Sequence, residues 1–413
     1  MPVACRNGSD DAQSSSAWSS LLQNLLTLFL NPVVGKMSDI HGRRMIFVFC
    51  LFTYTLAPIV LVGMEFSPTM EPIYYYVASS LIGAVSYSSI AFAIISDSVL
   101  EEYRTASFGV IMAGFYSGFC LSPFLALLLS HIQVSILSAV LTGGALTYTM
   151  VCFPETLPES VRAMNQQLVM EQQTDRAQSL GNRIGTGLIR PLREISILNR
   201  DRIIRLVASA SFFSSMVYAA DSTLVLYYIE EYLDVREQDI AYQFLIMGMV
   251  GVLLQGCLLQ PLLKCFGDKG LLVVAFLSGT THNLLYGVAK SKRTLYLALS
   301  LSQLTKTNAP ILASLASKDA GSNEQGQLQG ALYAVNALGG AIGPLSMEFI
   351  YERTKDTIGP GTMFIFASFL YFVGTMIVIS IPVGKADENS LPLDDTLRSA
   401  EIEEPLLASS SEL

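Results

Sequence analysis

The stretch Gly35-Lys36-Met37-Ser38-Asp39-Ile40-His41-Gly42-Arg43-Arg44 lies between two apolar runs, residues 17–34 and 45–63. Each run is close to the roughly 20 mainly apolar residues that cross a lipid bilayer as a helix. The stretch between them is short and basic, and basic residues concentrate in loops on the cytoplasmic side of a membrane. These residues therefore predict two membrane-spanning helices joined by a short cytoplasmic loop.

The composition of the whole chain is that of an integral membrane protein. Hydrophobic residues make up 51% of the chain, charged residues only 14%, and the mean hydropathy is +0.47. A soluble domain has roughly 25% charged residues. The net charge of −9 does not indicate nucleic acid as a partner. We predict eleven spans in a lipid bilayer: 17–34, 45–63, 72–95, 106–130, 134–153, 206–229, 239–263, 271–289, 294–316, 326–350 and 361–382.

The longest polar interruption divides these spans into five and six. The predicted organisation is an all-α membrane protein with these parts: a polar N-terminal segment at 1–16, a helical bundle at 17–153, a cytoplasmic linker at 154–205, a second bundle at 206–382 and an acidic tail at 383–413. Placing the first loop inside puts 17 Lys and Arg on the cytoplasmic side and six in the loops on the outside.

An internal repeat relates the two bundles. Three residues of the fourth span recur in the tenth at a constant offset of 221 residues: Gly109, Gly118 and Pro123 correspond to Gly330, Gly339 and Pro344. Gly267, in a weaker copy of the first loop, follows Gly42 at an offset of 225 residues. Parallel repeats of this kind are a transporter architecture, with two pseudo-symmetric bundles around a central cavity.

The chain resembles the major facilitator superfamily over nearly its full length, and within it the tetracycline–proton antiporter-like group that includes hippocampus-abundant-transcript-like proteins. Three signatures carry the resemblance: the loop Gly35–Arg44, the segment Pro154-Glu155-Thr156-Leu157-Pro158-Glu159-Ser160, and the segment Glu324-Gln325-Gly326-Gln327-Leu328-Gln329-Gly330 that leads to Gly343-Pro344. The antiporter pattern in the fourth span is incomplete, because Ser122, Ala126 and Leu127 replace three glycines.

The resemblance implies secondary transport of a small solute by alternating access, with proton coupling left open. It also implies one more helix ahead of the first span, so the alternative is a truncated, non-transporting isoform or a regulatory membrane protein. Neither enzymatic activity nor a cofactor or metal is expected. The membrane is either the plasma membrane or a vacuole-like or lysosome-like endomembrane, and the substrate, coupling ion and oligomeric state are not predicted.

The first loop is the candidate for a conformational latch. A carboxylate such as Asp39 can satisfy the free amides at a helix N-terminus. The guanidinium of Arg43 or Arg44 can pair with a second carboxylate, and Asp97 is the candidate partner. In the family such a cluster holds the cytoplasmic side closed. The alternative is a basic loop that only sets topology. The predicted latch residues are Gly35, Asp39, Gly42, Arg43, Arg44 and Asp97.

Lys306 is the candidate for a solute or ion contact inside the membrane. It lies about 16 Å into its predicted span at 1.5 Å per residue, where a lysine costs about 2.5–3.5 kcal/mol on insertion scales. It should therefore face a wet cavity or a partner, although a snorkelling or structurally paired lysine is the alternative. The other predicted pathway residues are Asp221, as counter-ion of Lys306 or as proton carrier, and the polar Tyr218, Gln303, Asn308 and Tyr87.

Small residues suggest helix packing. The lone intramembrane His282 is interpreted as a hydrogen-bonded packing residue, and a proton relay is the alternative. Glycines spaced four residues apart allow two helix backbones to approach closely. The predicted packing residues are Gly109, Gly118, Pro123, Gly330, Gly339, Gly343 and Pro344.

Overall fold

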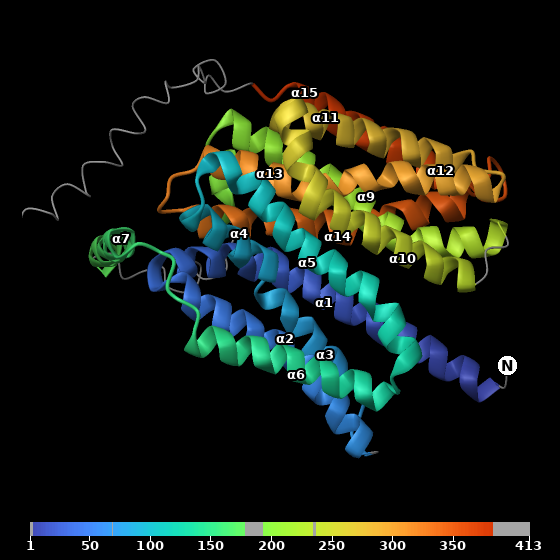
Figure 1. Cartoon of the computed structure of the whole chain (residues 1–413), viewed down its shortest axis with the longest axis horizontal. Coiled ribbons are helices and arrows are strands. Elements are labelled where there is room, and N and C mark those ends of the chain that lie inside the picture. Colours follow the sequence, from blue (N-terminus) through green and yellow to red (C-terminus); the bar gives the residue numbers. More distant parts are fainter. Residues whose placement is uncertain (1–2, 68, 178–192, 234–236, 383–413) are drawn as a thin grey trace, which may run out of the picture.

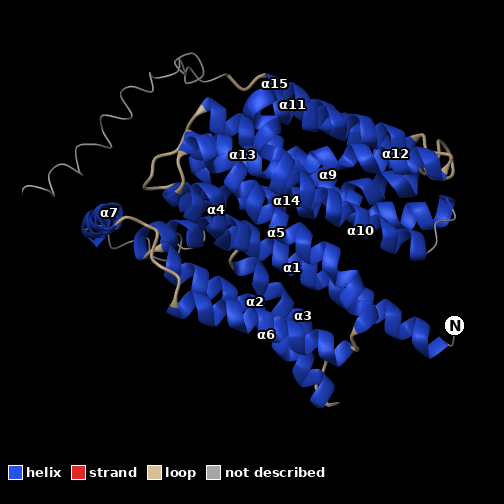
Figure 2. Ribbon diagram, in the orientation of Figure 1, coloured by secondary structure: helices blue, strands red, loops and turns tan. Residues whose placement is uncertain are grey.

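The computed structural model describes residues 3–67, 69–177, 193–233 and 237–382, and these form helices joined by short loops, with no strand among them (Figures 1 and 2). The predicted tail at 383–413 lies outside the described residues. The first half contains these elements: α1 (Val3–His41), α2 (Arg43–Phe66), α3 (Ile73–Leu81), η1 (Ile82–Ala84), α4 (Tyr87–Ser98), α5 (Glu101–Leu128), α6 (His131–Val151) and α7 (Glu159–Ala177).

The second half is preceded by η2 (Ser196–Asn199), a short 3-10 turn that lies, like α7, within the predicted linker at 154–205. Its elements are α9 (Arg202–Leu233), α10 (Glu237–Leu253), the π-helical turn η3 (Leu254–Leu258), α11 (Leu259–Gly287), α12 (Lys292–Ser302), the 3-10 turn η4 (Gln303–Thr307), α13 (Asn308–Lys318), α14 (Gln325–Thr354) and α15 (Thr362–Ile379).

Seven described segments are long and apolar enough to cross a membrane: 43–66, 73–98, 101–122, 131–151, 202–221, 245–287 and 362–379. The sixth of these contains two predicted spans, because Gly267 (φ +68°) breaks α11. The predicted spans at 17–34, 294–316 and 326–350 fall outside this set. They carry polar residues such as Gln23, Asn24 and Asn336, and the second is interrupted at η4.

Helix α1 differs from the prediction at both ends. It runs without a break from Val3 to His41, through the predicted polar N-terminal segment and most of the predicted loop. Only Gly42 separates α1 from α2, with φ of +108°, a conformation that suits glycine because it has no Cβ. The ten-residue loop is thus reduced to a sharp corner, which fixes where Asp39 and Arg43 stand relative to each other.

Helices α1 and α14 lie side by side where the two halves meet, and both run the length of the molecule (Figure 1). Glycines allow this approach: a Cβ on Gly35 would overlap the Gly326 carbonyl, and a Cβ on Gly330 would overlap the Asn31 carbonyl. Helix α5 packs in the same way on α10 and η3, where a Cβ on Gly109 would overlap Leu259. The contact of α1 with α14 and the contact of α5 with α10 thus place residues from the loops of one half beside the helix ends of the other half.

Candidate functional site

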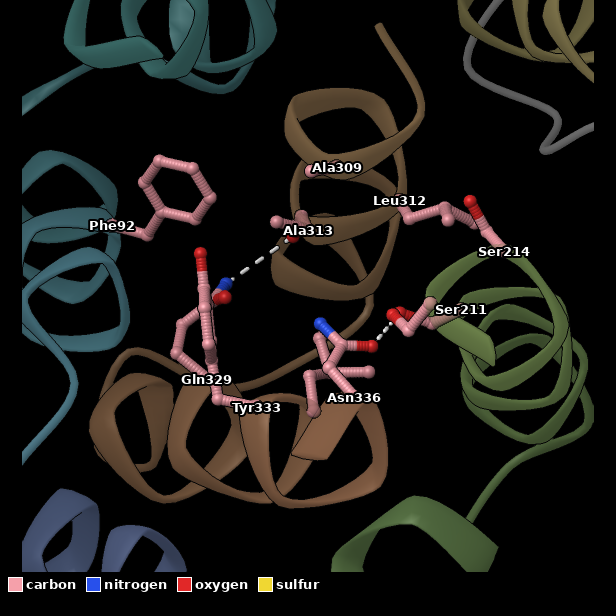
Figure 3. A pocket seen from close by; sticks show the side chains of 11 residues that line it. Phe92, Ser211, Ser214, Ala309, Leu312, Ala313, Gln329, Tyr333 and Asn336 are labelled. Atoms are coloured by element: carbon pink, nitrogen blue, oxygen red, sulfur yellow. Dashed lines mark hydrogen bonds between the residues drawn. The ribbon is translucent and has the colours of Figure 1, made fainter. Parts of the chain in front are cut away.

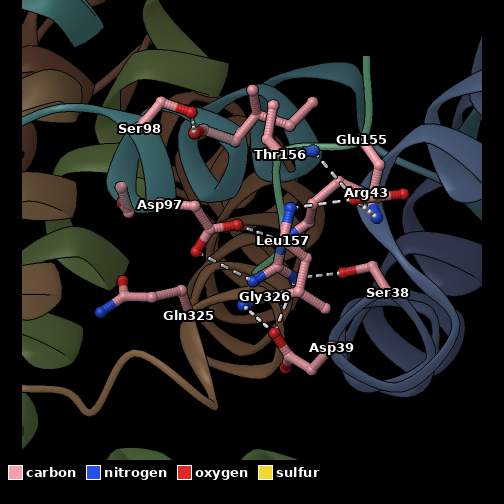
Figure 4. Close-up of polar contacts among 12 residues, drawn as sticks. Ser38, Asp39, Arg43, Asp97, Ser98, Glu155, Thr156, Leu157, Gln325 and Gly326 are labelled. Atoms are coloured by element: carbon pink, nitrogen blue, oxygen red, sulfur yellow. Dashed lines mark hydrogen bonds and ion pairs between the residues drawn. The ribbon is translucent and has the colours of Figure 1, made fainter. Parts of the chain in front are cut away.

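Asp39 joins the two halves at the end of the molecule where α7 lies, here called the α7 end (Figures 1 and 4). The backbone amide of Gly326 donates to its Oδ1 at 2.9 Å, and that of Gln327 donates to Oδ2 at 2.8 Å. Both amides belong to the first turn of α14, where N–H groups have no partner within the helix. A carboxylate from the first half thus satisfies the helix N-terminus of the second, and it favours the positive end of the helix dipole.

Arg43 holds this carboxylate in place and links it to α4 (Figure 4). Its Nη1 lies 2.6 Å from Asp39 Oδ1, and its Nε donates to Asp97 Oδ2 at 2.7 Å. Nη1 also donates to Ser38 Oγ at 2.6 Å. The Arg43 side chain is fully buried. Burial raises the pKa of the Asp39 carboxyl, while the Arg43 guanidinium and then the two α14 amides oppose this rise.

Glu155, in the second sequence signature, completes this cluster. Its Oε1 accepts from the Arg43 amide at 2.8 Å, and its Oε2 accepts from the Arg44 amide at 3.2 Å. The carboxylate therefore caps the N-terminus of α2. It also occupies the space beside Gly42, where a Cβ would overlap Oε2. Arg44 donates to the Met150 carbonyl and does not contact Asp97 in the part of the chain that is described.

The second half carries a related cluster around Asp268, which follows Gly267 as Arg43 follows Gly42. Asp268 Oδ1 accepts from the Thr105 hydroxyl of α5 at 2.9 Å, and Oδ2 accepts from Lys318 Nζ. Lys318 corresponds to Asp97 at the offset of 221 residues. The two halves therefore contain equivalent ion pairs in which the cation and the anion have exchanged places.

The pseudo-two-fold relation continues between these pairs. Ser317 Oγ donates to Ser96 Oγ at 2.9 Å, and these serines correspond at the same offset of 221. Arg104 Nη1 donates to the Ser317 carbonyl at 3.3 Å and Nη2 to the Ser96 carbonyl at 3.0 Å. Asn165 of α7 adds a further bridge, because Nδ2 contacts the carbonyls of Asp39 and Asn323 at 2.9 and 3.0 Å. The halves are thus tied together at the α7 end.

A cavity of about 280 Å³ lies between the halves, away from this end. On α1 its lining residues precede Asp39 by 12 to 16 positions, or roughly 18–24 Å along the helix. The described residues that line it are all uncharged: Gln23, Asn24, Thr27, Tyr54, Ile82, Ser86, Ser215, Tyr218, Ala219, Tyr333, Asn336, Ala337 and Gly340. They come from both halves, so movement of one half against the other changes the cavity.

A smaller pocket of about 40 Å³ adjoins the cavity through Ser215, Tyr333 and Asn336 (Figure 3). The Ser211 hydroxyl on α9 donates to Asn336 Oδ1 on α14 at 2.6 Å. Phe92 of α4 lines the other side of this pocket. Together the two spaces form a polar region in the middle of the molecule, lined by amides and hydroxyls.

Of the predicted pathway residues, Tyr218 lines the cavity and the others lie beside it. Lys306 Nζ donates to the Met247 carbonyl at 2.8 Å and stands 4.5 Å from the centre of the Tyr116 ring. Pro310 has no N–H for the Lys306 carbonyl, and Gln255 Nε2 donates to that carbonyl at 2.6 Å instead. Lys306 is thus held between α10 and α5, by a carbonyl and an aromatic ring.

The remaining predicted pathway residues have contacts within their own halves. Asp221 contacts His282 and Asn283 rather than Lys306, so the structure does not bring the predicted counter-ions together. Asn308 Nδ2 donates to Ser214 Oγ at 3.1 Å. The two other residues lie outside the cavity lining: Gln303, which donates to the Leu299 carbonyl, and Tyr87, which packs on Phe47.

The predicted packing glycines behave differently in the two halves. A Cβ on Gly339 would stand 2.7 Å from the Phe212 carbonyl of α9, and one on Gly343 would overlap the Met216 carbonyl. Gly118, the counterpart of Gly339, has no described atom within 4 Å of its Cβ position. The packing prediction is therefore wrong for Gly118 within the described residues, because no described helix occupies the place on α5 that α9 occupies on α14. The Pro123 side chain lies outside the described part.

This contrast predicts opposite effects of one substitution. Gly339→Ala is expected to lower the thermal unfolding midpoint, because overpacking costs about 1–3 kcal/mol. Gly118→Ala is expected to leave it unchanged or raise it, because alanine stabilises a helix by up to about 1 kcal/mol relative to glycine. Thermal unfolding of both purified variants in one detergent checks this. Equal destabilisation of the two would show that Gly118 is covered by a neighbour.

Sequence reasoning missed most of the cavity and one part of the latch. Gln23, Asn24 and Asn336 were visible as amides inside predicted spans, which is unusual enough to mark them. Glu155 was visible only as part of a signature. Asp268 and Lys318 could have been found by applying the two repeat offsets to Arg43 and Asp97.

Comparisons with known proteins agree with this geometry. The hippocampus abundant transcript 1 protein of Mus musculus is 23% identical over 335 residues, covering 80% of this chain, and the chain spans 64% of that protein's length. The class D tetracycline resistance protein of Salmonella ordonez is 24% identical over 365 residues, covering 86% of this chain and 83% of that protein.

Solved structures show the same fold. The crystal structure of the human organic anion transporter MFSD10 (TETRAN) superposes with a TM-score of 0.72 at 21% identity, covering 88% of this chain and 84% of that one. The family model of the Major Facilitator Superfamily matches residues 10–344. This match covers most of the chain, so the protein belongs to the major facilitator superfamily of membrane transporters.

Proposed function

We propose that the protein is a secondary active transporter that moves a small solute by alternating access. The observation that carries the proposal is the central cavity, whose lining comes from both halves, together with an α7 end that is tied shut. With the α7 end in the cytoplasm, as the basic residues predict, this is a state closed toward the cytoplasm. Release of the Asp39 and Asp268 clusters would open that end.

The lining also indicates the chemistry of the solute. Amide groups of Gln23, Asn24 and Asn336 and hydroxyls of Thr27 and Ser215 supply hydrogen bonds, and three tyrosines supply aromatic surface. The cavity is close to the lower end of the range of about 300–1,000 Å³ for ligand sites. Because the described lining residues are uncharged, the arrangement favours an uncharged polar or amphipathic solute. The organic anions and tetracycline named for the related proteins are therefore useful members of a panel rather than the expected substrates.

Uptake into proteoliposomes across a panel of labelled sugars, polyols, amphipathic drugs and organic anions tests the proposal. For any solute that is taken up, Asn336→Ala is expected to lower the initial rate at least about fivefold, because a lost hydrogen bond in a dry site costs about 1–3 kcal/mol. Thr147→Ala is the matched control, since Thr147 is exposed on α6 and bonds only its own helix at Gly143. Equal loss in both variants would remove the assignment of the cavity as the solute site.

A second candidate function is a non-transporting regulatory membrane protein. It is favoured by one observation, the open face of α5 at Gly114 and Gly118, where the described residues provide no covering helix. The same assay separates the two functions: well-inserted protein that takes up no solute of the panel would favour the regulatory protein.

A further inference from the structure

The second half contains a buried acid–base pair that the proposed solute site does not use. Asp221 of α9 and His282 of α11 approach each other, with 3.3 Å between Oδ2 and Nε2. The His282 side chain is 2% exposed and that of Asp221 is 19% exposed. A carboxylate and an imidazole in this setting are costly unless they have a function or good partners, because charged groups in the membrane interior are poorly solvated.

The partners of His282 fit two protonation states. Nδ1 lies 3.1 Å from the Ser278 carbonyl, so it carries a hydrogen in either state. Nε2 lies 3.0 Å from Asn283 Nδ2, a donor, and 3.3 Å from Asp221 Oδ2, an acceptor. A neutral His282 can accept at Nε2 from Asn283, and a protonated one can donate from Nε2 to Asp221. Nε2 therefore has a hydrogen-bond partner in both states: Asn283 when it is deprotonated and Asp221 when it is protonated.

The polar atoms around the pair are incompletely satisfied. Asp221 Oδ1 and Asn283 Oδ1 are buried and lack a hydrogen-bond partner among the described residues. With Asp221 ionised and His282 neutral the pair carries one buried negative charge. Uptake of one proton at Nε2 makes the pair neutral overall, which reduces the cost of burying it. The geometry is therefore that of a site that binds and releases one proton.

Tyr371 lies against this pair on one side and bonds a residue of the small pocket on the other. The Tyr371 ring of α15 packs edge-on to His282, with 6.0 Å between ring centres, and its hydroxyl bonds Ser214 and Thr305. Ser214 lines the small pocket and accepts from Asn308. Among the described residues, the titratable groups that face the pair are Tyr286 on the same helix as His282 and Tyr371. Asp221 itself follows the cavity residue Tyr218 by three positions, on the same side of α9.

We propose that Asp221 and His282 form one proton-binding site that couples proton movement to transport through α9. The proposal rests on the proposed transport function and adds to it the coupling ion and the residues that carry it. The pair takes up a proton when the cavity is open to one side and releases it when the cavity is open to the other side. Because α9 also lines the cavity, a change in the pair can alter the solute site.

The first experiment measures the proton site without any solute. The chain has three histidines, and His41 and His131 are exposed. NMR of histidine-labelled protein in nanodiscs is expected to show a His282 resonance whose position changes with pH, because Nε2 gains or loses its proton. In Asp221→Asn the pH dependence of that resonance should change, while His41 and His131 remain as in the wild type and report an intact fold. A His282 resonance that does not move, or that is unaffected by Asp221→Asn, overturns the proposal.

The second experiment tests coupling. In proteoliposomes, Asp221→Asn and His282→Gln are each expected to lose at least about tenfold of proton-gradient-driven accumulation, while exchange of solute without a gradient continues. His131→Gln is the control and should behave as wild type. Titration of the pair with no uptake of any solute would overturn the transport function and leave the proton site. Gradient-driven accumulation that survives in both variants would overturn the coupling and leave transport.

Discussion

Arg43→Ala is expected to lower the initial rate of solute uptake at least about tenfold at equal protein levels in the membrane. Arg43 is fully buried and is the common cation of Asp39 and Asp97. Removing one partner of such a buried cluster costs about 3–5 kcal/mol, because the remaining charges stay buried without compensation. Asp39 also caps α14 across the interface, so the cost falls on the state in which the α7 end is closed. Uptake by reconstituted protein measures the effect.

Two companion variants separate loss of the latch from loss of charge. Arg44→Ala removes the neighbouring cation, which contacts only the Met150 carbonyl in the described part, and should retain most of the activity. Arg43→Lys keeps the charge but cannot bond both carboxylates with one planar group, so it should fall between the other two. Alkylation of Ser317→Cys, at a fully buried position between the halves, should become faster with Arg43→Ala. Wild-type uptake and labelling in Arg43→Ala would show that the cluster is no latch.

How far the fold was predictable depends on how local each feature is. The all-helical membrane architecture followed from apolar runs, because a span is recognised from about 20 consecutive residues. The extent of α1 did not follow from the sequence. Residues 3–16 and 35–41 are mainly polar, so they were predicted to be a polar N-terminal segment and part of a cytoplasmic loop. At residues 35–41 the helix is held by other helices: the Asp39 side chain accepts from the first turn of α14, and the carbonyls of Asp39 and Ile40 accept from α7.

The candidate site divides in the same way. Asp39 was predicted as a helix cap from its residue type and position, and the structure places it at the N-terminus of α14. The partner of Asp221 could not be predicted, because His282 is 61 residues away and the helices that carry them are brought together only by the packed second half. The contacts of Lys306 could not be predicted for a similar reason: the Met247 carbonyl is 59 residues away, and Tyr116 lies on the other half.

The exchanged charges of the two latch clusters point to a common geometric role with different chemistry. Arg43 and Asp97 both belong to the first half, and Asp268 and Lys318 both belong to the second half. Each pair positions a carboxylate that reaches across: Asp39 to α14, and Asp268 to Thr105 on α5. If the ion pair itself matters more than which position carries the cation, the second pair should tolerate a cation at position 268 and an anion at position 318, as in the first pair.

Exchanging the charges of the second pair tests this directly. Asp268→Lys alone places two ammonium groups in contact, and Lys318→Asp alone places two carboxylates in contact. Like charges in contact cost several kcal/mol. Each single variant is therefore expected to lower uptake about tenfold, and the double variant Asp268→Lys/Lys318→Asp should recover at least about half of the wild-type rate. Recovery stays incomplete because a lysine at position 268 cannot accept from the Thr105 hydroxyl.

The surface pair Glu352 and Lys355, whose side chains are 58% and 31% exposed, provides the matched control at the end of α14 remote from Asp39. Exchange of its charges, singly or together, should leave uptake within about twofold, because exposed ion pairs contribute about 0–1 kcal/mol. A double variant at 268 and 318 that is as inactive as its two single variants would contradict the second latch. In that case the contact of Asp268 with Thr105, rather than its pairing with Lys318, would be the interaction that the closed α7 end requires, and Thr105→Val should then reproduce the loss.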